Sequence, residues 1–306
     1  MYNIKQAAAR AGISVPVLRA WERRYGIVNP ERSASGYRRF DDASVARVRT
    51  MRGLVEDGWS PSAAAAAILA GDVPITAAPP GTRAVAGGPA GSGAALHAAD
   101  EVGAELSERL VAAAAGLDAA AVETVLDELF SRGSFERVAS DLLFPALERL
   151  GVAWAAGEVS VAGEHLASAA VQRRLAIALE AAATPGKGPR ILVGLPPGSR
   201  HELGALAFAV AAGRAGLAVV YLGPDLPVDD WVTAAADSDA AVIGVVTRRD
   251  RRPALQVAQA ILAARTTGLV VFGGDAAPDE PGVLVLPAAL PDAVASLRTA
   301  LASGGR

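Results

Sequence analysis

The sequence predicts a multidomain chain: an N-terminal winged helix–turn–helix (all-α), a central four-helix bundle and a C-terminal α/β domain with a doubly wound parallel sheet. Apolar residues follow helical spacing in residues 1–75 and 96–185. Short β-branched runs alternate with helical runs in residues 186–306, a pattern typical of a parallel sheet covered by helices. Residues 76–95 are rich in Ala, Pro and Gly and predict a flexible linker.

The composition narrows the class of protein. Hydrophobic residues make up 52% of the 306 residues and the net charge is −3, which indicates a globular chain that is not basic overall. The absence of cysteine excludes disulfides, thiolate catalysis and zinc sites with cysteine ligands. The first residues do not resemble a signal peptide, and no apolar run is suited to span a bilayer. We therefore expect a cytoplasmic protein.

The first 75 residues predict helix, turn, helix, basic loop and helix in that order. A short helix is expected at 4–11, and Ser14 can cap a second helix with Pro16 in its first turn. Residues 30–39 form a basic loop containing glycine, which we expect to be a two-stranded wing. Further helices are expected at 41–57 and 61–69.

Arginines on the second helix lie off its apolar stripe, where they can contact phosphates and guanine edges in a major groove. An aromatic residue and two arginines in the loop suit a neighbouring DNA backbone or minor groove. A basic helix alone is more often a solvated, salt-bridged surface, but the order of elements favours DNA binding. The residues predicted to contact DNA are Ser14, Arg19, Arg23, Arg24, Tyr37, Arg38 and Arg39.

Residues 96–185 predict four helices, broken at glycines, that pack as a bundle. At the last break the sequence runs Trp154-Ala-Ala-Gly-Glu-Val-Ser-Val-Ala-Gly-Glu164-His165. The side chains of Trp154, Glu164 and His165, brought together at one end of a bundle, could cap a flat cofactor. From spacing alone, a core tryptophan beside a surface Glu-His pair is the favoured interpretation.

The C-terminal domain is predicted to bind a ligand at one edge of its sheet. His201 follows the first strand, and ligands of open α/β sheets bind at the carboxyl ends of strands. A neutral imidazole there can ligate a transition metal, although a position at a helix N-terminus is an equally good interpretation. Gly204, Thr247, Gly273 and Gly274 fall on the same edge. We expect strands at 191–195, 218–222, 241–246, 269–272 and 283–286, and helices at 202–215, 228–235, 254–264 and 291–301.

Three runs of the N-terminal domain carry a resemblance to a known family. They are Ile4-Lys-Gln-Ala-Ala-Ala-Arg-Ala-Gly-Ile-Ser14, Leu18-Arg-Ala-Trp-Glu-Arg-Arg-Tyr-Gly26 and Gly36-Tyr-Arg-Arg-Phe40. They resemble the winged-helix domain of MerR-type regulators. The resemblance implies a dimer on a palindromic operator, with the second helix in the major groove and the wing beside it. Many MerR proteins dimerise through a coiled coil after this domain, whereas a Pro/Gly linker and a bundle follow here.

The pattern Trp-x9-Glu-His in the bundle, followed by His-x-x-Gly in the α/β domain, resembles the cobalamin-binding module of methionine synthase and CarH-like photoreceptors. With the MerR-type head, nearly the whole chain is similar to the CarH/LitR architecture. This implies a Rossmann-like domain that binds cobalamin, most readily adenosylcobalamin, with His201 as the lower axial ligand of cobalt. Trp154, Glu164 and His165 would surround the upper face. The implied cofactor-binding residues are Trp154, Glu164, His165, Ser199, His201, Gly204, Thr247, Gly273 and Gly274.

The resemblance further implies a repressor, dimeric or tetrameric, that leaves DNA when light breaks the cobalt–carbon bond; no enzymatic activity is expected. The sequence departs from the pattern in three places. Ser199 replaces the acidic residue two positions before His201 that would help to orient the imidazole. Ala155 stands where many CarH proteins have a histidine, and Thr247 is followed by a run of arginines up to Arg252. The alternative is therefore a MerR-type regulator that has lost cobalamin and responds to another ligand or a protein partner.

Overall fold

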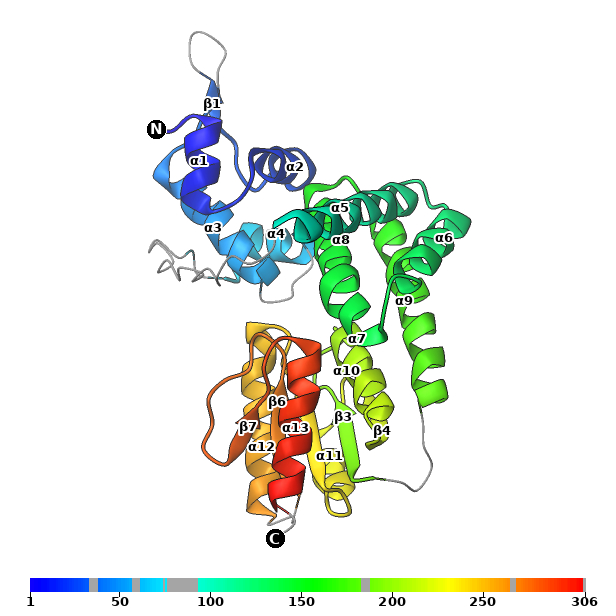
Figure 1. Cartoon of the computed structure of the whole chain (residues 1–306). Helices are drawn as coiled ribbons and strands as arrows, with labels where there is room; N and C mark the ends of the chain where they lie inside the picture. The colour runs from blue at the N-terminus through cyan, green and yellow to red at the C-terminus, as the bar shows by residue number, and fades with distance from the viewer. Residues whose placement is uncertain are drawn as a thin grey trace.

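The computed structural model describes residues 1–32, 38–56, 61–73, 75, 93–182, 188–264 and 268–304. Within these ranges the chain forms a helix–turn–helix unit, a helical bundle beside it, and an α/β unit at the other end of the bundle (Figure 1). The predicted order of fold types is confirmed. Among the helices of the described residues, none is long and apolar enough to cross a membrane.

The helix–turn–helix unit is specified by its caps. Asn3 accepts a hydrogen bond from the backbone N–H of Gln6 at 2.9 Å and so begins the first helix. Gly12 adopts a left-handed φ of 74° at the turn, and Ser14 begins the second helix by accepting a hydrogen bond from the N–H of Val17 at 3.4 Å. The elements are α1 Ile4–Ala11, α2 Val15–Tyr25, β1 Glu31–Arg32, β2 Arg38–Arg39, α3 Asp42–Glu56 and α4 Pro61–Ala70.

The two short strands β1 and β2 pair antiparallel and form the base of the predicted wing. The core of this unit lies between α1, α2, α3 and α4. Leu18, Trp21, Phe40 and Met51 are each at most 2% exposed within it. Leu18 and Trp21 come from α2, Phe40 follows β2 and Met51 lies on α3. The burial of these large side chains therefore holds α2 against its neighbours.

The central unit contains four helical rods, and one of them is irregular. α5 begins at Gly93, inside the predicted linker, and the rest of that linker, residues 76–92, lies outside the described residues. Pro145 lacks the N–H of a helix interior and clashes with the preceding turn, so the third rod passes through a π-helical turn just before it. The elements are α5 Gly93–Ala115, α6 Ala119–Phe130, α7 Phe135–Val138, η1 Ala139–Leu143, α8 Phe144–Ala156 and α9 Val161–Ala182.

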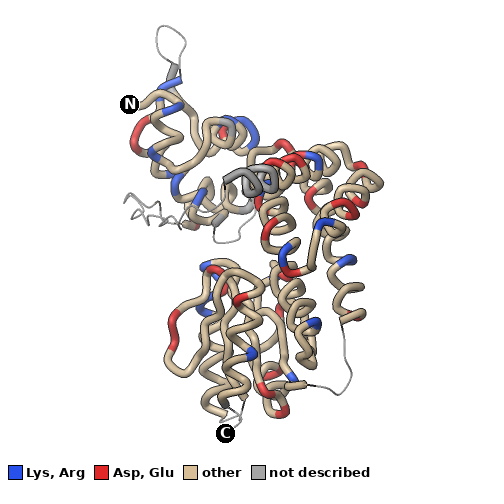
Figure 2. The backbone as a smooth tube through the Cα atoms, in the orientation of Figure 1, with Lys and Arg blue, Asp and Glu red and all other residues tan. Residues whose placement is uncertain are grey.

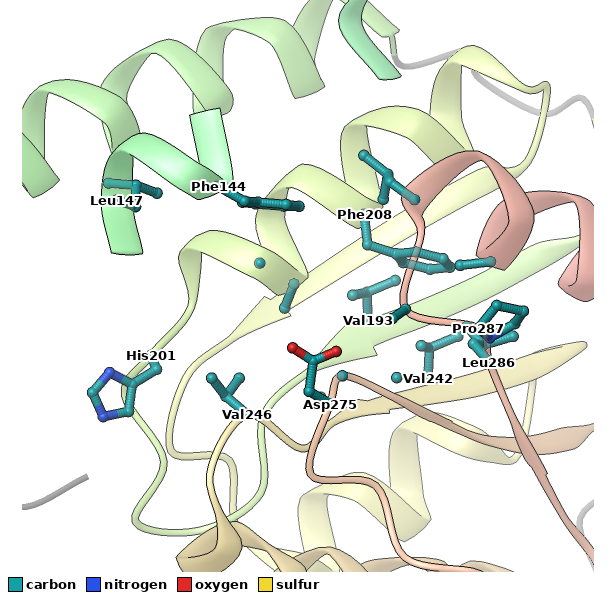
Figure 3. A pocket seen from close by; sticks show the side chains of 18 of the residues that line it. Phe144, Leu147, Val193, His201, Phe208, Val242, Val246, Asp275, Leu286 and Pro287 are labelled. Carbon is teal, nitrogen blue, oxygen red and sulfur yellow. The ribbon is translucent and has the colours of Figure 1, made fainter. Parts of the chain in front are cut away.

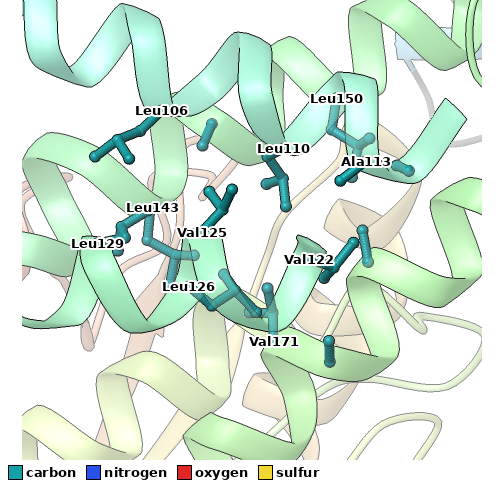
Figure 4. Close-up of a cluster of buried hydrophobic side chains, with 14 of the residues drawn as sticks. Leu106, Leu110, Ala113, Val122, Val125, Leu126, Leu129, Leu143, Leu150 and Val171 are labelled. Carbon is teal, nitrogen blue, oxygen red and sulfur yellow. The ribbon is translucent and has the colours of Figure 1, made fainter. Parts of the chain in front are cut away.

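The bundle is held by a continuous apolar core. In Figure 4, leucine and valine side chains from all four rods point toward one another. Leu110, Leu126, Leu143 and Val171 are fully buried there. Burial of this kind contributes roughly 1.5–3 kcal/mol for each large aliphatic side chain, so the core positions α8 and α9 firmly relative to each other.

The C-terminal unit is a parallel sheet with strand order β4-β3-β5-β6-β7. This order, with α10 and α13 on one face and α11 and α12 on the other, confirms the doubly wound fold. β5 ends at Gly244, two residues before the predicted end, and α12 begins at Arg251 instead of residue 254. The elements are β3 Arg190–Gly194, α10 Leu203–Arg214, β4 Ala218–Gly223, α11 Val228–Ala235, β5 Ala240–Gly244, η2 Arg248–Asp250, α12 Arg251–Ala263, β6 Leu269–Gly273, β7 Val283–Val285 and α13 Leu290–Gly304.

Both faces of the central strands are buried, which explains their unbroken apolar runs. Along β3, Ile191 and Val193 face α10 and α13, whereas Leu192 faces α11 and α12. The carboxyl ends of the strands point toward the bundle (Figure 1). α10 packs along α9, and a Cβ on Gly213 would lie 3.3 Å from the Cβ of Ala182. The sheet edge predicted to bind a ligand therefore faces the bundle.

Candidate ligand site and DNA interface

The carboxyl ends of β3, β5 and β6 border a cavity with a volume of about 560 Å³. α10 and α13 form one side of it, and the first turns of α8 reach it from the bundle (Figure 3). The lining residues are Phe144, Leu147, Glu148, Val193, His201, Gly204, Ala205, Phe208, Val242, Gly244, Val246, Gly273, Gly274, Asp275, Leu286, Pro287, Ala288, Leu290 and Ala293.

Most of this lining is apolar, and its ionisable side chains are few. His201 lies at the rim, Glu148 is on α8, and Asp275 follows β6. An apolar cavity of this size with a small number of polar groups is typical of a site for a small molecule or a cofactor. His201 is exposed there, and in Figure 3 its imidazole points outward from its loop, away from the other lining side chains, where it is accessible from solvent.

The loop that carries His201 is held by the loop after β4. The N–H of Gly198 donates to Oδ1 of Asp225 at 2.6 Å, and the N–H of Asp225 donates to the carbonyl of Ser199 at 3.0 Å. Ser199 itself is 1% exposed, and its Oγ has no hydrogen-bond partner among the described residues. A buried hydroxyl without a partner is costly, which makes this atom a candidate contact for a bound group.

Glu202, directly after His201, ties the same loop to the bundle and to the sheet. Nε2 of Gln172 on α9 donates to Oε1 of Glu202 at 2.6 Å, and the hydroxyl of Tyr221 on β4 donates to Oε2 at 2.8 Å. Burial and this hydrogen bond to a carboxylate raise the pKa of Tyr221 far above its ordinary value. Tyr221 therefore remains a protonated donor, and the base of the His201 loop is fixed from two sides.

Several glycines line the cavity, and one of them, Gly274, cannot be replaced by any other residue. Gly274 has a φ of +108°, and a Cβ there would lie 2.5 Å from the carbonyl oxygen of Val245. Only glycine fits this conformation and this close approach. Gly204 also lines the cavity, with no neighbouring atom within 4 Å of a Cβ placed on it.

Thr247, by contrast, is not among the lining residues. Its hydroxyl donates to Oδ2 of Asp250 at 3.0 Å and so begins the short helical turn η2. Val246, one position earlier, lines the cavity instead. The arginine run continues into α12, where Nε of Arg251 donates to the carbonyl of Ala276 at 2.7 Å.

Trp154, Glu164 and His165 lie around the turn between α8 and α9, and none of them lines the cavity. Trp154 is half-buried against the bundle core. Oε1 of Glu164 accepts a hydrogen bond from Ser168 at 2.6 Å, and its Oε2 lies 3.7 Å from Nε2 of the exposed His165. The seven-residue separation from Leu147 along α8 places Trp154 about 10 Å from the roof of the cavity.

Lys and Arg residues gather along the backbone of the helix–turn–helix unit, on α2 and on the β1–β2 ribbon (Figure 2). A groove of about 530 Å³ lies between α2 and β2, and Nε of Arg38 donates to Oε1 of Glu22 across it at 2.8 Å. Arg24 and Arg39 are exposed outside the groove, and Tyr37 lies outside the described residues. The residues lining the groove are Arg19, Glu22, Arg23, Gly26, Val28, Asn29 and Arg38.

Two family profiles match the chain. Residues 2–70 match "MerR HTH family regulatory protein", and residues 106–179 match "B12 binding domain". The HTH-type transcriptional repressor CarH of Myxococcus xanthus is 32% identical over 278 residues, which is 90% of this chain and 89% of that protein. The chain belongs to the CarH family of MerR-type transcriptional regulators. It is therefore a transcriptional regulator with a B12-binding domain and not an enzyme.

A second curated relative agrees with this assignment. The HTH-type transcriptional repressor CarA of Myxococcus xanthus is 32% identical over 227 residues, covering 74% of this chain and 69% of that protein. Among solved structures, the monomethylamine corrinoid protein of Methanosarcina barkeri aligns with a TM-score of 0.49 and 16% identity, over 65% of this chain and 98% of that chain.

The structure brings together part of the predicted ligand site. His201, Gly204, Gly273 and Gly274 share the cavity, whereas the three bundle residues gather at the other end of α8. The apolar roof of the cavity, formed by Phe144 and Leu147, and Asp275 were not predicted from the sequence. The roof gave no signal because its phenylalanine and leucine look like ordinary bundle residues, but Asp275, directly after the Gly-Gly pair at a strand end, could have been found.

Proposed function

We propose that this regulator is a repressor whose DNA binding is controlled by a bound cobalamin, with His201 as the protein ligand of cobalt. One observation carries the proposal: an accessible imidazole at the rim of an apolar cavity, on the edge of the sheet that faces the bundle. The match of the bundle to a B12-binding domain supports it. The named relatives that are repressors support the direction of control.

The donor set of the site fits a corrinoid. Among the described residues, no group of three or more His, Cys, Asp or Glu side chains could hold a metal ion. A cobalt already held by the four nitrogens of a corrin ring needs only one further ligand from the protein, which His201 can supply. A cobalamin is larger than the cavity, so only a part of it would lie inside, against Gly273 and Gly274.

The remaining predicted residues would serve the outer parts of the ligand. Trp154 supplies an apolar ring, and Glu164 and His165 supply polar contacts, for the side of the ligand opposite His201. Ser199 would form a hydrogen bond through its unpartnered hydroxyl, and Thr247 would keep the cavity open through η2. When bound, adenosylcobalamin would supply a cobalt–carbon bond that light can break.

The DNA-binding half of the proposal rests on α2 and on the two-stranded ribbon formed by β1 and β2. Arg19, Arg23 and Arg38 would contact phosphates or base edges, with Arg24 and Arg39 nearby. Ser14 would cap α2 and so present its N-terminus to the backbone. We expect a homo-oligomer, dimer or tetramer, on a palindromic operator in the cytoplasm.

One observation favours the alternative, a regulator that has lost cobalamin. The position that would orient His201 holds an uncharged serine, and exposed arginines stand near the site at Arg248 and Arg252. These features would suit a different, anionic ligand. The two functions are separated by whether the purified chain retains a corrinoid.

The test is a spectrum of the full chain after incubation with adenosylcobalamin in the dark and removal of free ligand. The proposal predicts one retained cobalamin per chain and an absorption spectrum that changes on illumination. His201→Ala should shift the visible spectrum by removing the axial nitrogen, whereas His165→Ala should leave the axial bond in place. A colourless protein, or an identical spectrum for His201→Ala, would contradict the proposal.

A further inference from the structure

The DNA-reading helix α2 touches the bundle at the last turn of α8. Nε1 of Trp21 donates to the carbonyl oxygen of Ala155 at 3.1 Å, across 134 positions of the sequence. Trp21 is 2% exposed and otherwise packs in the core of the helix–turn–helix unit. A single side chain therefore supports α2 and binds it to the bundle.

Two further residues of the bundle complete this surface. Ala156 is 9% exposed and packs into the apolar core of the helix–turn–helix unit, the one bundle residue in that cluster among the described residues. Gly157 ends α8 with a φ of 77°, and a Cβ on it would lie 2.6 Å from Nη1 of Arg24. We call these residues, Trp21 and Arg24 on one side and Ala155, Ala156 and Gly157 on the other, the α2–α8 contact.

The chemistry of this contact resembles that of a DNA backbone. The last carbonyls of a helix lack intrahelical partners, and the end of the helix carries a partial negative charge. At the end of α8, the indole N–H of Trp21 donates to one of these carbonyls and the guanidinium of Arg24 lies beside Gly157, as donors and cations on a recognition helix lie beside phosphate oxygens. Nη1 of Arg24 therefore lies beside Gly157 at the end of α8 in this arrangement, although the residue stays exposed to solvent.

We propose that the α2–α8 contact is autoinhibitory: the end of α8 occupies Arg24 and holds α2, and tight DNA binding requires their separation. Arg19 and Arg23 stay exposed in the groove beside β2, so the docked form keeps a weaker affinity for DNA. The inference rests on the DNA-binding half of the proposed function and not on cobalamin. If Trp154 does contact the ligand, its position next to Ala155 gives the ligand a direct route to α2.

The test uses Ala156→Gln in the full chain, with Val152→Gln as the control one turn earlier on α8, where the side chain is 56% exposed. The glutamine would prevent close packing on α2 but would be solvated once the units separate. Since the chain has no cysteine, Lys5→Cys and Ala120→Cys allow spin labels on the two units. We expect Ala156→Gln to lengthen and broaden the label distance, and Val152→Gln to match the unsubstituted chain.

DNA binding is measured without cobalamin, on a duplex selected from a random-sequence pool by the full chain. If the docked form outnumbers the separated form by three- to tenfold, only about one quarter to one eleventh of the chains can bind tightly, so Ala156→Gln should bind DNA up to about four- to elevenfold more tightly. The slope of log affinity against log salt should steepen by about 0.9 as Arg24 gains a phosphate. Adding Arg24→Ala should reverse the gain in slope.

Two results would contradict autoinhibition by the α2–α8 contact. An unchanged label distance in Ala156→Gln would show that the contact does not hold the units together. A longer distance with unchanged affinity and slope would show that the contact does not inhibit. Because all these measurements are made in the ligand-free chain, a chain that fails to retain cobalamin would overturn the proposed ligand and leave autoinhibition standing.

Discussion

The two ends of α8 face different partners and use different chemistry. Its first turns extend Phe144 and Leu147 over the cavity that holds His201. Its last turn offers the carbonyl of Ala155 and the small side chain of Ala156 to α2. The helix has 13 residues and is therefore about 20 Å long, so one rigid rod joins the ligand site to the DNA reader.

The difference in chemistry between the two ends of α8 determines which end tolerates a displacement of the helix. The roof of the cavity is made of apolar side chains, whose contacts have no fixed direction and can adapt to ligands of different shape. The contact with α2 depends on a hydrogen bond and on a methyl group in a closed core, both sensitive to small displacements. A modest shift of α8 would therefore leave the apolar contacts at the cavity largely intact, but it would weaken the hydrogen bond and the packing against α2.

The largest effect is expected from filling the cavity. A Cβ on Gly273 would lie 3.8 Å from Leu286 and 3.9 Å from Val242, so alanine fits there without strain. A leucine would extend into the cavity that we assign to cobalamin. Overpacking costs about 1–3 kcal/mol, so Gly273→Leu should weaken cobalamin binding by about 5- to 150-fold, measured by equilibrium dialysis.

Gly273→Ala is the matched control and should lose less than threefold. Neither substitution should change DNA affinity in the ligand-free chain, because the α2–α8 contact lies at the opposite end of α8. Equal losses for alanine and leucine, or a fall in thermal stability large enough to account for the loss, would contradict the assignment of the cavity.

Sequence predicted the fold well where local chemistry determines it. The caps at Ser14 and Gly12, the alternation of buried strands with helices, and the glycine at the end of α8 are all local signals. The π-helical turn before Pro145 was missed because the prediction counted glycine breaks, although the proline itself marks the position. The end of β5 was placed too late because Val245 and Val246 look like strand residues but follow the last ladder pair.

The candidate site was harder to predict, because it is assembled from distant segments. His201 and Gly274 could be placed by the rule for strand ends. The bond from Trp21 to Ala155 could not, since tryptophan in a helix predicts a core residue and a backbone carbonyl carries no sequence signal. Placement of Trp154 away from the cavity likewise depends on the direction of α8, which apolar periodicity does not fix.

A fivefold effect is expected at the other end of α8. Trp21→Phe keeps the aromatic ring in the core but removes the donor to Ala155. A lost hydrogen bond costs about 1 kcal/mol, roughly fivefold in an equilibrium, so the docked form should be less populated and the apparent DNA affinity up to fivefold higher. Filter binding on the selected duplex, together with the Lys5→Cys and Ala120→Cys label distance, measures both.

Trp231→Phe is the control for this substitution. Trp231 is fully buried in the α/β unit, and its Nε1 has no hydrogen-bond partner among the described residues. Removing that donor should leave DNA affinity unchanged, while thermal stability should fall because the smaller ring leaves a gap in the core. If Trp21→Phe were to behave like Trp231→Phe in the DNA assay, the bond to Ala155 would have no part in docking.

The smallest effect concerns the ion pairs between α6 and α9, the bundle helices that pack around α8, and it depends on pH. Hydrogen bonds from Arg174 and then Arg173 on α9 lower the pKa of Glu123 on α6 below its ordinary value of 4.5. A lowered folded-state pKa means that the bonds contribute above about pH 4.5 and are lost as the pH falls through the folded-state pKa. Because Glu123 is 39% exposed, solvent screening limits the contribution to less than about 1 kcal/mol.

Glu123→Gln should therefore lower the melting temperature at pH 7 by at most about 4 °C, followed by far-UV circular dichroism. The difference from the unsubstituted chain should shrink as the pH falls below 4.5 and Glu123 becomes protonated in both states. Glu105→Gln removes a 69% exposed carboxylate 3.8 Å from Arg109 and should show no such dependence. If Glu123→Gln lowered the melting temperature by the same amount at every pH, packing, and not the ion pairs with α9, would hold α6 in the bundle.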